Sequence, residues 1–156
     1  TQGGRFAGYG FYLLDGKPVY LWNLFGMQRV KWEGDKALTP GKHTLEFDFK
    51  YDGLGAATLK YGSPSGLGRS GTGYLKVDGK VVAVKKMDKT IPMLLQWCDS
   101  FDVGGDTGSP VNDEDYKTPF RFNGKLEKLT LTIDRPELSP EDINKLKMAL
   151  HNTTSD

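Results

Sequence analysis

Two Asp-Gly pairs, each lying between runs of β-branched and aromatic residues, constrain the fold of this chain most. Asp15-Gly16 separates residues 9–14 from residues 19–25, and Asp78-Gly79 is flanked in the same way. Asp and Gly tolerate the positive φ angles that a two-residue hairpin turn requires. The sequence therefore predicts two antiparallel β-hairpins.

Residues 44–51 predict a further strand, because apolar and polar residues alternate strictly along them. The two faces are made by Leu45, Phe47, Phe49 and Tyr51 on one side and by Thr44, Glu46, Asp48 and Lys50 on the other. A strand with one dry and one wet face is typical of an antiparallel sheet. We expect this strand to be half-buried.

Residues 120–133 also alternate, but the phase changes partway. The apolar residues fall into two sets: Phe120, Phe122 and Leu126 in one phase, Leu129, Leu131 and Ile133 in the other. A β-bulge between Gly124 and Lys128 would return both sets to one face, and a turn at Asn123-Gly124 between two strands would explain the change equally well. Both interpretations predict further β-structure here.

The predicted fold class is all-β: a two-sheet antiparallel sandwich, jelly-roll or concanavalin-like, with one short C-terminal helix. Many short strands favour this class, as do the 20 glycines in 156 residues, because glycine serves turns and bulges. Ser139 as N-cap and Pro140 at the first helical position mark the helix. We expect the sandwich over residues 1–138, the helix packed on it over 139–150, and a flexible tail over 151–156.

Charge and cysteine content argue against several classes of function. The 21 Lys and Arg against 20 Asp and Glu give a formal charge of +1, so we expect neither a nucleic-acid nor a membrane partner. Cys98 is the only cysteine, which excludes an intrachain disulfide, and we expect it to be a buried structural residue. His43 and His151 have no acid–base partner that the sequence reveals. We expect no catalytic residue in this chain.

The acidic segment 99–115 is the candidate metal site. It places carboxylates in a glycine-containing loop, and calcium takes about six to eight oxygen ligands of this kind. The spacing does not match an EF-hand, so a solvated acidic loop is the competing interpretation. The candidate calcium ligands are Asp102, Asp106, Asp113 and Asp115.

Aromatic residues around the first hairpin form the second candidate site. Both faces of residues 19–25 are largely apolar, whereas a strand with a wet face should alternate. Either the hairpin lies between two layers of the domain, or its outer face docks on a partner or a sugar. The candidates are Tyr20, Trp22, Phe25 and Trp32. Only one of Trp22 and Phe25 should point outward, because they lie in opposite phase.

An ordered series of short motifs resembles the C-terminal region of large bacterial arylsulfatases. The series runs through Gln2-Gly3-Gly4-Arg5-Phe6, Asp48-Phe49-Lys50-Tyr51-Asp52-Gly53, Phe101-Asp102-Val103-Gly104 and Pro119-Phe120-Arg121-Phe122. It covers most of the chain from Gln2 to roughly Pro140. Residues 56–69 depart from it, because they are longer than the short Gly-rich connector expected there.

The resemblance implies a role without catalysis. Sulfatases of this kind use a formylglycine, made from the Cys or Ser of a C/S-x-P-x-R motif, beside a divalent metal. Cys98 is followed by Asp99-Ser100-Phe101-Asp102, without the Pro or the Arg, so no catalytic residue carries over. The resemblance therefore implies an accessory domain that docks on the catalytic domain of the same polypeptide and helps to shape the mouth of its active site.

Further expectations follow from the same resemblance. The chain would be a piece of a longer periplasmic or secreted protein, and a homo-oligomer is a further expected partner arrangement. The alternative function is a stand-alone carbohydrate-binding, lectin-like module, with Tyr20, Trp22 or Trp32 as stacking platforms.

Overall fold

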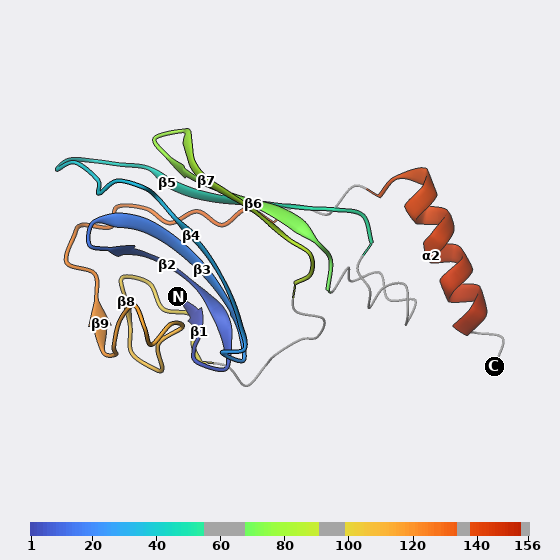
Figure 1. Ribbon diagram of the computed structural model, residues 1–156, viewed down its shortest axis with the longest axis horizontal. Coiled ribbons are helices and arrows are strands. Elements are labelled where there is room, and N and C mark those ends of the chain that lie inside the picture. The colour runs from blue at the N-terminus through green and yellow to red at the C-terminus, as the bar shows by residue number, and fades with distance from the viewer. Residues whose placement is uncertain (55–67, 91–98, 134–137, 154–156) are drawn as a thin grey trace. The chain divides into compact units, whose positions relative to one another are not determined.

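The computed structural model describes residues 1–54, 68–90, 99–133 and 138–153 (Figure 1). In these ranges the strands are β1 (Gln2–Gly3), β2 (Ala7–Leu14), β3 (Lys17–Leu24), β4 (Gln28–Glu33), β5 (Leu45–Tyr51), β6 (Gly71–Val77), β7 (Lys80–Met87), β8 (Gly105–Asp106) and β9 (Phe120–Arg121). The helix is α2 (Pro140–Thr153). The expected all-β class with one short C-terminal helix is confirmed.

The strands form three antiparallel sheets, in the orders β1-β2-β3-β4, β5-β6-β7 and β8-β9. Both predicted hairpins are present, because Asp15 and Gly16 have φ values of 50° and 77°, and Asp78 and Gly79 have 49° and 77°. These positive φ angles are the ones that a two-residue turn between twisted strands requires. The alternating segment that begins at Thr44 forms β5, also as expected.

The chain divides into two compact units. One is made of Thr1–Asp48, Tyr74–Val84 and Leu95–Leu131, and the other of Phe49–Gly73, Lys85–Leu94 and Thr132–Asp156. The first unit contains the four-stranded sheet, the β8-β9 pair and all of the candidate site residues. The second contains α2.

In the first unit, β3 has protein on both of its faces. On one face Val19 and Leu21 are buried together with Val111, which comes from the loop between β8 and β9. On the other face the ring of Tyr20 stacks on Phe47 of β5, with centroids 3.4 Å apart and planes inclined by 6°. The hairpin therefore lies between two layers, which accounts for the failure of alternation along β3 and fits a sandwich. The jelly-roll connectivity stays a prediction.

Residues 120–133 differ from expectation. Only Phe120 and Arg121 pair, as β9, and residues 122–133 form no strand. The apolar side chains of this segment are exposed: Leu126, Leu129, Leu131 and Ile133. Neither the bulge nor the second strand is formed, because an alternating pattern becomes a strand only where a neighbouring strand edge accepts its hydrogen bonds.

The helix begins where the sequence predicts. The side-chain hydroxyl of Ser139 accepts a hydrogen bond from the amide of Asp142 at 3.1 Å, as an N-cap does. Lys145 and Glu141 form an ion pair one turn apart, at 2.7 Å. The helix continues to Thr153, three residues beyond its expected end, and its packing on the sandwich stays a prediction. No helix in the described ranges has the length and apolar character of a membrane span.

Candidate functional site

The four candidate calcium ligands have separate partners. Asp106 is buried and accepts a hydrogen bond from the hydroxyl of Tyr116 at 2.5 Å. Asp115 accepts hydrogen bonds from the hydroxyl of Tyr12 and from Lys31, whose Nζ lies 2.8 Å away. Burial by itself would raise the pKa of Asp115, but these bonds outweigh it and hold that pKa below its usual range.

The other two carboxylates face different groups. Asp113 pairs with Arg29 at 2.8 Å and with Arg5 at 3.8 Å. Asp102 accepts bonds from the amide and hydroxyl of Thr107, at 2.9 and 3.1 Å, and from the hydroxyl of Ser100 at 2.9 Å. In the part of the chain that the structure describes, no three His, Cys, Asp or Glu side chains gather to hold a metal. The four candidate ligands therefore share no common centre, and the calcium hypothesis is left to experiment.

Of the four candidate aromatic residues, Trp22 and Trp32 are buried and Tyr20 is half-buried. Trp32 is fully buried, Trp22 is 8% exposed, and Tyr20 packs between Trp32 and Phe47. Buried Trp22 and Trp32 have no open ring face for a ligand or partner, whereas a ligand or partner contact at half-buried Tyr20 stays a prediction. Phe25 is 37% exposed, but it lies in the turn after β3, so its exposure is not set by its phase relative to Trp22.

His43 has partners that the sequence did not reveal. Its Nδ1 lies 2.7 Å from the carboxylate of Asp78, and its Nε2 lies 2.8 Å from the carbonyl oxygen of Thr39 and 3.4 Å from the Thr39 hydroxyl. A carboxylate, an imidazole and a hydroxyl in series resemble a nucleophilic triad. Here, however, Nε2 donates to a carbonyl, so neither ring nitrogen is available as a base. These bonds link the segment before β5, which holds Thr39 and His43, to the β6–β7 turn at Asp78.

Cys98, which the sequence predicts to be a buried structural residue, lies outside the described residues.

Two surface features remain as candidate sites, and the first is an apolar tip made of Phe6, Phe25 and Met27. These side chains are 67%, 37% and 82% exposed. They come from the β1–β2 loop and the β3–β4 turn, which are joined where the amide of Phe25 donates to the carbonyl of Phe6 at 2.5 Å. The tip is therefore a surface of large apolar groups drawn from two neighbouring connections.

Buried Asn23, at the end of β3, holds the apolar tip in place. Its side-chain nitrogen donates to the carbonyl oxygens of Gly4 and Arg5, at 3.1 and 2.9 Å, and its side-chain oxygen accepts the amide of Gly26 at 3.0 Å. One side chain thus satisfies backbone groups of both connections. Because Asn23 is fully buried, these bonds replace the water that its amide would otherwise keep.

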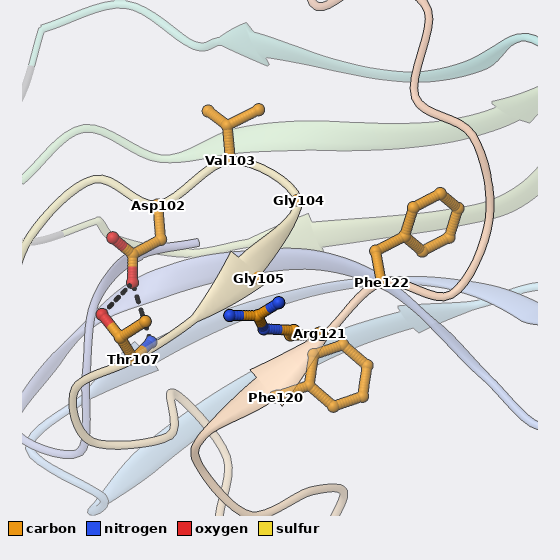
Figure 2. Close-up of a pocket in the computed structure, with 8 residues that line it drawn as sticks. All are labelled: Asp102, Val103, Gly104, Gly105, Thr107, Phe120, Arg121 and Phe122. Atoms are coloured by element: carbon orange, nitrogen blue, oxygen red, sulfur yellow. Dashed lines mark hydrogen bonds between the residues drawn. The ribbon is translucent and has the colours of Figure 1, made fainter.

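The second feature is a surface hollow of ≈ 370 Å³ beside the β8-β9 pair (Figure 2). Its lining residues are Asp102, Val103, Gly104, Gly105, Thr107, Phe120, Arg121 and Phe122. Figure 2 shows the guanidinium of Arg121 projecting across it, with the two Phe rings on one side and Asp102 and Thr107 on the other. A cation, an anion and two aromatic rings therefore border one space.

Phe6, Met27 and Arg121 are not among the site residues that the sequence indicates. The sequence does carry a signal for the exposed apolar tip, because Phe25-Gly26-Met27 places bulky apolar residues in a turn too tight to cover them. The sequence carries no such signal for Arg121, because β9 is brought close to the Asp102 loop only by its pairing with β8.

Comparison with known proteins adds nothing further about this site. A scan against protein-family models, a search of curated proteins and a search of solved structures each found no match.

Proposed function

We propose that this chain is a non-catalytic accessory domain that docks on the catalytic domain of a sulfatase through the apolar tip. The observation that carries the proposal is the joint exposure of Phe6, Phe25 and Met27 on two connections pinned together by Asn23. The choice of a sulfatase as partner rests on the resemblance of the motifs. As part of such an enzyme the domain would act in the periplasm or outside the cell.

The surroundings of the tip have the composition of a protein interface. An apolar centre surrounded by charged residues is the usual anatomy of such surfaces. Beside the tip, Arg29 pairs with Asp113 at 2.8 Å and with Glu114 at 3.4 Å, and Arg5 also approaches Asp113. Arg5 and Glu114 keep most of their contact with water, whereas the side chain of Arg29 is only 22% exposed. The exposed charges can orient a partner without a large desolvation cost.

The energetics suit docking within one polypeptide. Burying a large apolar side chain contributes roughly 1.5–3 kcal/mol, so three of them supply several kcal/mol before the cost of association. A linked partner is present at an effective concentration on the order of millimolar, so this modest gain is sufficient.

The backbone of Phe25 gives further support. Phe25 has a φ of 55°, which costs a non-glycine residue roughly 1–2 kcal/mol. Phe25 keeps this conformation although its side chain is only partly covered by the domain, at 37% exposure. Strain of this kind at an exposed side chain is typical of a surface kept for contact with something else.

The first test is the reading frame upstream of Thr1. A sulfatase domain with a C/S-x-P-x-R motif in that frame supports the proposal, and a frame that holds none contradicts it. The second test mixes that catalytic domain, expressed without this chain, with the 156-residue chain and measures binding by calorimetry. We expect Phe25→Ser and Met27→Ser each to weaken binding about tenfold, which corresponds to about 1.4 kcal/mol.

The matched control is Val84→Ser, which removes an exposed apolar side chain on β7, away from the tip. An equal loss of binding with Val84→Ser would contradict docking through the tip. Sedimentation of the chain alone gives a further check. A dimer that is abolished by Phe25→Ser would show that the tip contacts a second copy instead of a sulfatase domain. No hydrolysis of an aryl sulfate is expected from the chain alone.

A further inference from the structure

The hollow beside β8-β9 has a fixed framework. Gly105 pairs with Arg121 in the β8-β9 ladder, and the amide of Phe122 donates to the carbonyl of Gly104 at 3.0 Å. A Cβ on Gly105 would lie 2.8 Å from the carbonyl oxygen of Phe120, so only glycine permits this close approach. The ring of Phe120 is held in turn by Tyr116, with centroids 5.2 Å apart. The backbone of β8 and β9 and the ring of Phe120 are therefore positioned before any ligand arrives.

Arg121 supplies unused donors. Its side chain is exposed, and among the described residues it makes neither an ion pair nor a side-chain hydrogen bond. A guanidinium offers five N–H donors in a planar fork that matches a carboxylate or a sulfate. The polar group best suited to this side of the hollow is therefore an anion.

Asp102 supplies the acceptor on the opposite side. Its Oδ2 accepts two bonds from Thr107, and its Oδ1 accepts one from Ser100. Because a carboxylate has about four lone-pair sites, these three bonds leave Asp102 one further acceptor site. The same bonds, the Thr107 amide first and Ser100 next, lower the pKa of Asp102, so it is ionised at neutral pH. A phosphate-rich ligand would meet this negative charge, whereas a hydroxyl would donate to it.

Phe120 and Phe122 supply apolar ring faces. Both are half-buried, so each keeps part of its ring open. Aromatic faces favour flat apolar surfaces, and the C–H face of a sugar ring is one. A volume of ≈ 370 Å³ lies near the lower end of small-molecule sites, which begin at about 300 Å³, so it suits one or two rings.

We propose that this hollow binds one ring of an acidic saccharide. The apolar face of the ring lies on Phe122 or Phe120, a carboxylate or sulfate substituent pairs with Arg121, and a ring hydroxyl donates to Asp102. The proposal does not depend on the docking role of the apolar tip, because the two surfaces share no residue.

The test is a titration of the 156-residue chain with glucuronate, glucose 6-sulfate and glucose, followed by amide NMR shifts. We expect saturable shifts at Gly104, Gly105, Thr107 and Phe122 with at least one of the two acidic sugars, and binding of glucose about tenfold weaker. Comparing the titrations with glucuronate and with glucose 6-sulfate shows whether the hollow binds a carboxylate or a sulfate. An absence of saturable shifts with both acidic sugars would overturn the proposal.

Variants separate recognition from general charge attraction. Arg121→Gln should weaken the acidic sugar about tenfold and leave glucose binding nearly unchanged, and Phe122→Ala should weaken both. The matched control is Lys125→Gln, which removes one positive charge from a side chain that is 86% exposed and outside the hollow. An equal effect of Lys125→Gln and Arg121→Gln, or an equal loss of glucose with Arg121→Gln, would overturn the assignment. Arg121 is exposed, so its replacement leaves the fold intact.

Discussion

The hydroxyl of Tyr116 donates a hydrogen bond to the buried carboxylate of Asp106, 2.5 Å away, and accepts one from the amide of Val111 at 3.0 Å. Asp106 is 2% exposed, so this hydrogen bond replaces water that its carboxylate would otherwise contact. Burial and the bond to Asp106 both raise the pKa of Tyr116, which therefore stays a donor at physiological pH. An aspartate that the sequence offers as a metal ligand here stabilises the loop between β8 and β9.

Tyr116→Phe should lower the free energy of unfolding by about 1.5–3 kcal/mol, because it leaves a buried carboxylate without its hydrogen-bond donor. Urea denaturation measures the change. The control is Tyr51→Phe, at a tyrosine that is 52% exposed, which should change stability by less than about 0.5 kcal/mol. Equal effects of the two substitutions would show that the bond to Asp106 contributes nothing.

Asn23→Ala should cost at least about 2 kcal/mol, because the backbone groups of Gly4, Arg5 and Gly26 lose their partner together. Asn123→Ala, at an exposed asparagine, is the matched control. Hydrogen exchange should also rise at the amides of Phe25 and Gly26. Unchanged exchange at these two amides would contradict the role of Asn23 in holding the apolar tip.

Phe25→Asn should move stability and docking in opposite directions. Asparagine adopts positive φ more readily than phenylalanine, so the isolated chain should become up to about 1 kcal/mol more stable. Binding to the catalytic domain should fall, because the exposed ring is lost. Thermal unfolding and calorimetry measure the two effects, and a destabilised Phe25→Asn chain would contradict the strain argument.

Asp78→Asn should destabilise the chain most in mildly acidic solution. The bonds to Asp78 and then to the Thr39 carbonyl raise the pKa of His43 above its ordinary 6.5, so the stability it contributes is complete below pH 6.5 and is lost as pH rises through the folded pKa. The Thr44 amide and then His43 lower the pKa of Asp78 below 3.8, so that contribution is lost as pH falls through the folded pKa.

The difference in melting temperature between wild type and Asp78→Asn should therefore be largest near pH 4–6.5 and shrink toward pH 9. Asp35→Asn, at an exposed aspartate, is the control and should show a small difference at every pH. A difference for Asp78→Asn that does not vary with pH would contradict the pairing with His43.

Chelator should leave the melting temperature within about 1 °C, because the four candidate calcium ligands already have separate partners. A metal that binds only the folded state stabilises it by mass action, so a bound calcium would be revealed as a loss of stability on its removal. Scanning calorimetry with EDTA and with millimolar calcium measures this. A drop in EDTA that calcium reverses, and that Asp102→Asn abolishes, would restore the calcium hypothesis.

Local signals made much of the fold predictable. The Asp-Gly turns, the alternation of β5 and the N-cap at Ser139 each depend on a few neighbouring residues, and all are present. Contacts across long separations were not predictable. His43 and Asp78 lie 35 residues apart, and the packing of Val111 on β3 needs the whole loop before β9. The alternating pattern after Asn123 does not form a strand for the same reason, because alternation alone does not specify the neighbouring strand with which a segment pairs.

The exposed run Leu129-Thr130-Leu131-Thr132-Ile133 affects how readily the chain aggregates in solution. It is uncharged, rich in residues of high β-propensity and free of proline, the composition that seeds cross-β assembly between molecules. Glu127 and Lys128 directly precede it and oppose such assembly, because stacking the chains in register would bring like charges together. Neutralising these two charges would shorten the time before fibrils nucleate in concentrated samples.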